Sequence, residues 1–127
     1  MREDDFAYVD ELYARWSPTW DFGPEQTEPV KESFSVPGSL EAVLGYYRDL
    51  WPLLMAPPPE SSPPLIEAPT LTVAGRDDYL LAPEAFDASA VAFANGYEVA
   101  VTSGGHFLHR EAPDEFIPIL LEFLGRP

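Results

Sequence analysis

The 127-residue sequence contains no cysteine, few basic residues and no long apolar run. Without cysteine the chain has no disulfide framework and no thiolate chemistry, which is compatible with a reducing compartment. No apolar segment approaches the roughly 20 residues that a membrane-spanning helix needs. The acidic N-terminal residues also differ from the basic start of a signal peptide. We therefore expect a cytoplasmic protein that has no membrane partner.

Positive charge is scarce: 7 Lys and Arg residues stand against 22 Asp and Glu residues, a formal net charge of −15. Such a chain repels the phosphates of nucleic acids and of anionic membranes, so neither is expected as a partner. The sequence also has no glycine-rich phosphate loop and no internal repeat, and we expect no bound cofactor. Net charge carries no information about the fold.

Proline is abundant, with 15 residues in the chain, and it divides the sequence. Residues 56–64 read APPPESSPP, in which five of nine residues are proline. We expect a stiff, extended linker here, beginning as early as Pro52. The predicted organisation is a helical segment at 1–55, a linker at 56–68 and a compact core at 69–127.

The first segment carries apolar residues at helical spacing. We predict one helix over residues 4–16, capped by Asp4 or Asp5, and a shorter one over residues 25–35. A third and more regular helix is expected to begin at Ser39, with the serine as its N-cap. These helices make the segment 1–55 predominantly α-helical.

The core segment predicts alternating strands and helices. Residues 71–74 form an apolar run typical of a parallel strand buried on both faces, and residues 97–102 predict the next strand. A helix from Pro83 to about Asn95 joins them in a right-handed crossover. The fold class is therefore α/β, with a β-α-β-α unit of parallel strands.

The last predicted helix begins at Pro113 and ends at Gly125. Pro118 lies inside this range, where it removes a backbone hydrogen bond and clashes one turn back, a cost of about 3 kcal/mol. We expect a kink at this point or a later start of the helix.

Two stretches carry candidate catalytic residues. His106 follows the second strand and two glycines, a placement that holds an imidazole ring and suits a general base. Asp77 and Asp78 lie just beyond the first strand, where a carboxylate can orient the histidine. The alternative interpretation is a loop histidine without chemistry, which the acidic pair makes less favourable.

These stretches resemble the C-terminal half of an α/β-hydrolase, in the branch of epoxide hydrolases and haloalkane dehalogenases. The acid motif P-T-L-x-x-x-G-x-x-D-x-x-x-x-P is matched by Pro69, Thr70, Leu71, Gly75, Asp78 and Pro83. The histidine motif G-H-F-L-x-x-E-x-P-x-x-F is matched by Gly105, His106, Phe107, Leu108, Glu111, Pro113 and Phe116. The resemblance implies that Asp78 is the triad acid and His106 the base, with Asp77 a non-catalytic neighbour.

The third helix resembles the last helix of the cap (lid) domain in epoxide-hydrolase relatives, through Pro37, Gly38, Tyr46, Tyr47 and Arg48. The resemblance implies that Tyr47 donates a hydrogen bond to the substrate oxygen, because a leaving alkoxide requires an acid. Segment 1–55 is then a lid. The alternative is an aromatic helix face that packs on a sheet.

The nucleophile is missing from the sequence. No G-x-S-x-G elbow occurs, and no equivalent strand–turn–helix segment presents Asp or Ser. Ser103 is a weak substitute because it belongs to the same turn as His106. The strands that precede the lid in the family are absent too, so the expected fold is a partial, truncated α/β-hydrolase fold without the N-terminal half of its sheet.

Two functions follow as alternatives. The first is hydrolysis of a small apolar ester, epoxide or halide substrate, with a separately encoded N-terminal half supplying the nucleophile. The second is a catalytically inactive remnant that forms a homo-oligomer or binds a partner, because a two-stranded sheet is marginal alone. A zinc site formed by His106, His109 and Glu111 has suitable residue types but spans a loop without fixed geometry, and we expect no metal.

Overall fold

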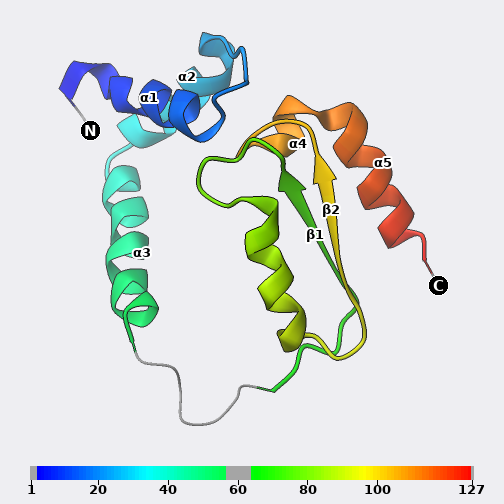
Figure 1. Cartoon of the computed structure of the whole chain (residues 1–127). Helices are drawn as coiled ribbons and strands as arrows, with labels where there is room; N and C mark the ends of the chain where they lie inside the picture. Colours follow the sequence, from blue (N-terminus) through cyan, green and yellow to red (C-terminus); the bar gives the residue numbers. More distant parts are fainter. Residues whose placement is uncertain (1–2, 57–63, 127) are drawn as a thin grey trace. The chain divides into compact units, whose positions relative to one another are not determined.

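The computed structural model describes residues 3–56 and 64–126 and has a mixed α/β fold (Figure 1). The predicted linker at 56–68 lies largely outside the described residues. The elements in chain order are η1 (Glu3–Phe6), α1 (Ala7–Trp16), α2 (Pro24–Ser35), α3 (Ser39–Leu54), β1 (Thr70–Gly75), η2 (Pro83–Ala92), β2 (Tyr97–Thr102), α4 (Leu108–Glu111) and α5 (Pro113–Leu124).

The chain divides into two compact units. Unit 1 comprises Met1–Asp10 and Phe22–Pro63, and unit 2 comprises Glu11–Asp21 and Pro64–Pro127. Helix α1 passes from the first unit into the second. Residues 11–21, which the sequence analysis assigns to the lid segment, therefore pack with the core strands and their loops.

In unit 2 the two strands pair in parallel, from Thr70 opposite Tyr97 to Gly75 opposite Thr102. The strand predicted at 97–102 is confirmed, and the strand predicted at 71–74 is one residue longer at each end. The connection η2 and the helix α5 lie on opposite sides of the strands (Figure 1). Strand, crossover and strand thus bring the carboxyl ends of β1 and β2 to the same end of the sheet.

The crossover helix differs from the prediction. It is a 3-10 helix that ends at Ala92, instead of a helix that reaches Asn95. The reason lies in Phe93, which adopts an extended conformation and pairs with Ile66 in a further parallel bridge. Backbone hydrogen bonds of Ile66 to Ala92 and Ala94 secure this bridge. Tertiary pairing therefore ends the helix before its local C-terminal signal does.

The described residues form a sheet of two strands only. Burial of β1 on both faces was expected, but its first four residues are only half-buried, whereas Ala74 and Gly75 are buried. The Thr70 N–H donates to the Gly96 carbonyl, so alternate residues of β1 face β2. By the same ladder geometry Leu71 and Val73 direct their N–H and C=O groups to the outer edge. That edge is available to another strand.

The last helix, α5, runs without interruption from Pro113 to Leu124. Pro118 lies inside it, so the expected later start is wrong. The proline removes one hydrogen bond to the carbonyl of Asp114, which lies in the exposed first turn, where water can bind that oxygen.

Unit 1 is built around a small apolar cluster. Its buried apolar side chains are Phe6, Val9 and Leu40, and the Phe6 and Phe34 rings pack with their centroids 6.2 Å apart. The helix predicted from residue 4 begins at Ala7, because Asp4, Asp5 and Phe6 have positive φ angles and form a separate turn.

Helix α3 differs from the prediction at both ends. Its N-cap is Gly38, with φ of 85°, and no side chain caps it, so the assignment of Ser39 as the cap is wrong. The helix also continues through Pro52 to Leu54, although the linker was expected to begin at Pro52. The Met55 N–H donates to the Trp51 carbonyl, so the last turn is closed despite the proline. A proline so close to the end of a helix interrupts only one hydrogen bond.

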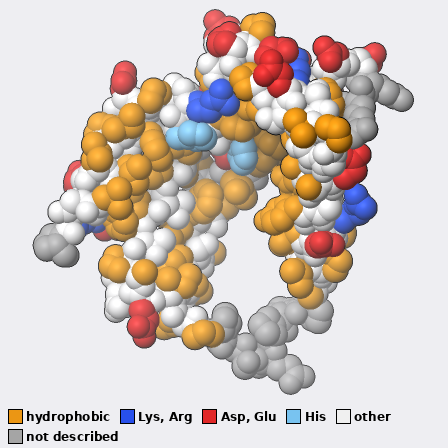
Figure 2. Space-filling model, turned by 180° about the vertical axis from the view of Figure 1, so that it is seen from behind, with side chains coloured by type: hydrophobic (Ala, Val, Ile, Leu, Met, Phe, Trp, Pro, Cys, Tyr) orange, Lys and Arg blue, Asp and Glu red, His pale blue; other side chains and the backbone are white. Residues whose placement is uncertain are grey.

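Large apolar side chains remain exposed in both units (Figure 2). On α3 they are Val43, Leu44, Tyr46, Tyr47, Trp51, Leu53 and Leu54, and on α5 they are Ile117, Leu121 and Leu124. In the part of the chain that the structure describes, every helix is too short or too polar to span a lipid bilayer. Exposed apolar side chains gathered on one helix, as on α3, are typical of a contact surface.

An ion pair within unit 1 predicts a pH dependence of stability. Lys31 Nζ lies 2.7 Å from Asp10 Oδ2. The hydrogen bond from Lys31 lowers the pKa of the Asp10 carboxyl below its ordinary value and raises the pKa of Lys31. The depressed folded pKa of Asp10 gives stability that is present above its unfolded pKa of about 4. This stability is lost as the pH falls through the folded value.

The Lys31→Met variant is therefore expected to be less stable than the wild type at neutral pH, and the two are expected to converge below about pH 4. Because the Asp10 side chain is partly exposed, the difference is small. Urea denaturation of the full chain at neutral and at acidic pH, followed by the signals of unit 1, measures this difference in stability. A difference that persists unchanged at low pH would contradict a role for the ion pair.

Candidate acid–histidine site

The two predicted core residues, Asp78 and His106, meet at the carboxyl end of the sheet. Asp78 lies three residues beyond β1, and His106 lies four residues beyond β2. His106 Nδ1 is 3.0 Å from Asp78 Oδ2. The Asp78 side chain is 9% exposed and the His106 side chain 31%. The carboxylate is thus shielded, whereas part of the imidazole ring is accessible.

Backbone groups hold the Asp78 carboxylate in place. Its Oδ1 atom accepts hydrogen bonds from the N–H groups of Leu80 at 2.7 Å and Leu81 at 3.2 Å. This leaves Oδ2 directed at His106. Both oxygens therefore have donors, as an ionised carboxylate with little solvent contact requires.

The same contact defines the roles of the two ring nitrogens of His106. A carboxylate accepts only, so Nδ1 carries a proton, and in the neutral ring the lone pair then lies on Nε2. In the described part of the chain no hydrogen bond reaches Nε2. The pair therefore presents an oriented, unoccupied basic nitrogen at the carboxyl end of β2.

Close backbone approach brings the two loops together. A Cβ atom on Gly75 would lie 2.2 Å from the Gly105 carbonyl oxygen and 2.7 Å from that of Gly104. Gly104 itself has a φ of 94°, in the region that favours glycine. The Asp77 N–H donates to the Gly104 carbonyl at 2.9 Å. Glycine on both loops is therefore a steric requirement of the acid–histidine contact.

Of the two acidic neighbours, only Asp78 contacts the histidine. Asp77 accepts a hydrogen bond from the Thr19 hydroxyl at 3.3 Å instead. Ser103, the substitute nucleophile considered above, donates its hydroxyl to Glu115 Oε1 at 2.5 Å and its N–H to Glu115 Oε2 at 2.9 Å. These two hydrogen bonds lower the pKa of Glu115. Ser103 therefore caps a carboxylate and is not paired with the base.

Sequence reasoning missed the contribution of residues 11–21. The Trp16 carbonyl accepts hydrogen bonds from the N–H groups of both Tyr79 and His106, each at 3.3 Å. One peptide oxygen thus joins the acid loop to the histidine loop. The Trp16 ring also meets the His106 ring edge to face, with centroids 5.1 Å apart. The sequence analysis placed the end of a helix at Trp16 and gave its carbonyl no role, because a backbone carbonyl leaves no signal in the sequence.

Ser17 was missed as a site residue, and Glu111 was considered only as a motif residue and as a possible zinc ligand. Glu111 accepts hydrogen bonds from the backbone N–H groups of Gly105 at 2.7 Å and Phe107 at 2.8 Å. It also accepts from the Ser17 hydroxyl at 2.6 Å, and Ser17 is fully buried. The motif contained Glu111, and its signal was an acidic residue one helical turn after a Gly-Gly-His turn.

Tyr47 belongs to unit 1, whereas the acid–histidine pair belongs to unit 2. Tyr47 is 58% exposed, and its ring packs edge to face on Tyr46. Tyr47 also lines an open groove on α3 with Leu44 and Trp51. Its assignment as a substrate-polarising residue stays a prediction.

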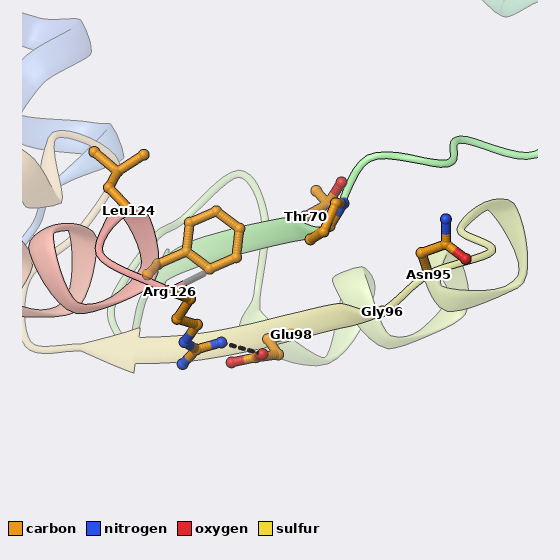
Figure 3. Close-up of a pocket in the computed structure, with 8 residues that line it drawn as sticks. Thr70, Asn95, Gly96, Glu98, Leu124 and Arg126 are labelled. Atoms are coloured by element: carbon orange, nitrogen blue, oxygen red, sulfur yellow. Dashed lines mark hydrogen bonds and ion pairs between the residues drawn. The ribbon is translucent and has the colours of Figure 1, made fainter.

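A second pocket, of about 440 Å³, lies at the amino ends of the strands (Figure 3). It is lined by Thr70 of β1, by Glu98 of β2 and by Gly96, which comes just before β2. Phe123 and Arg126 line it from the C-terminal segment, and Arg126 is paired with Glu98. The length of the strands, about 20 Å, separates this pocket from the carboxyl end of the sheet. The pocket therefore takes no part in the acid–histidine site.

The described residues contain no cluster of three or more His, Asp or Glu side chains that could hold a metal ion. Of the three residues considered for zinc, His106 contacts Asp78 and Glu111 accepts protein donors. His109 packs against the ring of Phe116. The three side chains are thus engaged separately.

No protein-family model matches the chain, and no curated protein matches it significantly. The class of site therefore rests on geometry alone. It is an acid–imidazole pair carried by two neighbouring parallel strands, with one ring nitrogen unoccupied.

Proposed function

We propose that this chain provides the acid–base half of a hydrolase active site for a small apolar ester, epoxide or halide substrate. In this function Asp78 orients His106, and His106 is the general base. The observation that carries the proposal is the 3.0 Å contact between Asp78 Oδ2 and His106 Nδ1, which leaves Nε2 without a partner among the described residues.

The chemistry requires an attacking atom from a segment outside these 127 residues. For an ester and a serine nucleophile, His106 Nε2 takes the hydroxyl proton as the serine oxygen attacks the carbonyl carbon. The proton then passes from His106 to the alcohol oxygen as the alcohol leaves, and an acyl intermediate forms on the nucleophile. His106 Nε2 then takes a proton from water while the water oxygen attacks the acyl carbon. The bond between the acyl carbon and the nucleophile breaks, His106 gives the proton to the nucleophile oxygen, and the carboxylic acid is released. Asp78 stabilises the imidazolium formed in each step.

The surroundings of the pair support a base rather than a structural histidine. The carboxylate is held by two backbone N–H groups, and the loop is held through the Trp16 carbonyl. Such fixed orientation is what a general base needs. Tyr47 is proposed, by resemblance alone, to polarise the substrate oxygen.

The test is reconstitution. If the neighbouring upstream reading frame encodes a chain with a G-x-S-x-G or G-x-D motif, the two chains are co-expressed. The complex is then assayed with a p-nitrophenyl ester and an aryl epoxide. Turnover by the complex, and not by either chain alone, is the expected result. Absence of turnover with every such partner and substrate would reject the proposed activity.

The open outer edge of β1 favours a second candidate function, an association module that pairs with another copy or another chain by strand addition. The purified chain is then expected to sediment as a dimer or larger species. Association should increase with salt, because salt screens the repulsion between chains of net charge −15. A well-folded monomer at all salt concentrations, seen by analytical ultracentrifugation, would exclude this module.

A further inference from the structure

The Glu111 carboxylate accepts hydrogen bonds from the backbone of the loop that carries His106. Its Oε2 atom accepts the N–H of Gly105 at 2.7 Å, and its Oε1 atom accepts the N–H of Phe107 at 2.8 Å. These are the residues immediately before and after His106. One carboxylate therefore holds the peptide groups on both sides of the histidine.

The buried Ser17 completes this arrangement. Its hydroxyl donates to Glu111 Oε1 at 2.6 Å and is fully buried. A Cβ atom on Gly105 would lie 2.6 Å from Ser17 Cα, so the loop packs directly on the Ser17 backbone. The carboxylate thus has three donors, and the loop has little room to move.

We propose that Glu111 is a positioning residue for His106. By fixing the peptide groups that flank the histidine, it keeps Nδ1 on the Asp78 carboxylate and leaves Nε2 as the basic nitrogen. The catalytic importance of this role rests on the proposed function. The geometry of the histidine can be measured without turnover.

A carboxylate suits this position better than an amide for a specific reason. All three groups that face Glu111 are donors. A carboxylate can accept hydrogen bonds at both of its oxygen atoms, whereas an amide can accept at only one. A glutamine has nearly the same shape but places an NH2 group against at least one of those donors. Glu111→Gln therefore removes a charge-assisted hydrogen bond while keeping the side-chain volume.

The test is NMR spectroscopy of the full chain with Glu111→Gln. Amide hydrogen exchange at Gly105 and Phe107 is expected to accelerate about tenfold to a hundredfold, because their hydrogen bonds to a charged group are lost. Long-range proton–nitrogen spectra of His106, recorded where imidazole is neutral, report the tautomer. The wild type is expected to show one tautomer, protonated at Nδ1, and the variant a mixture.

Glu115→Gln is the matched control. Glu115 also accepts two hydrogen bonds from one loop residue. That residue is Ser103, which is not adjacent to His106 in the chain. The control is expected to leave the His106 tautomer unchanged. If Glu111→Gln does not fold, Ser17→Ala takes its place, since it removes only the hydroxyl donor and should give a smaller shift in the same direction.

An unchanged His106 tautomer in the folded Glu111→Gln protein, or in Ser17→Ala if that variant is used, would overturn the inference. The same holds if Glu115→Gln shifts the tautomer equally. The proposed function fails separately, through absence of turnover in the reconstituted complex. A wild-type chain with a single His106 tautomer but no hydrolase activity would thus refute the function and leave the positioning role intact.

Discussion

His106→Ala is expected to lower hydrolysis by the reconstituted complex by about 10⁴-fold or more, because the attacking groups lose their only base. Asp78→Asn is expected to cost about 10⁴-fold as well. The asparagine amide can place a donor against Nδ1, which favours the tautomer with the proton on Nε2, and that nitrogen can then no longer accept one. Steady-state rates with the ester substrate measure both effects.

Asp77→Asn is the matched control for Asp78→Asn. It is the same chemical change one residue earlier, at a side chain that contacts Thr19 and not His106. Its rate is expected to stay close to that of the wild type. Equal turnover by the wild type and His106→Ala would reject the catalytic assignment, and equal losses in the two asparagine variants would reject the specific role of Asp78.

Gly75→Ala is expected to destabilise unit 2 by about 2–3 kcal/mol, because the added methyl group meets backbone atoms that cannot rotate away. The new Cβ would lie 2.2 Å from the Gly105 carbonyl oxygen. The acid and histidine loops must then separate, which also lengthens the contact between Asp78 and His106. Urea denaturation followed by the amide signals of β1 and β2 measures the loss.

Gly45→Ala provides the contrasting control. Gly45 lies inside α3, and a Cβ atom there would meet nothing within 4 Å. The substitution is expected to stabilise α3 by about 0.5–1 kcal/mol, because alanine is the better helix former. If Gly75→Ala is as well tolerated as Gly45→Ala, the close approach of the two loops is not a requirement of the site.

Much of the core was predictable because the signals were local. The strand at 97–102 follows from a β-branched apolar run, and the position of His106 follows from the glycines that precede it. The pairing of Asp78 rather than Asp77 with His106 was predicted from motif position, and the structure brings that pair together. Parallel strands place their carboxyl ends together, so the meeting of the two loops followed from topology.

Errors arose where the deciding interactions were not local. The crossover helix ends at Ala92 because Phe93 pairs with Ile66, which is distant in sequence. Gly38 occupies the N-cap position of α3 with a left-handed φ, so Ser39 is the first helical residue and not the cap. Pro52 and Pro118 lie within helices, because one missing hydrogen bond near a helix end is tolerated when the rest of the helix is intact.

By itself the sequence determined the α/β class, the positions of both strands, and the acid and histidine that meet beyond them. Only the tertiary structure decided what holds that pair: the Trp16 carbonyl between the two loops and the Glu111 carboxylate around His106. The physical reason is that periodicity and turn residues are encoded locally. The donors of one loop find their acceptors in segments as much as 90 residues away, and such partners exist only once the chain has folded.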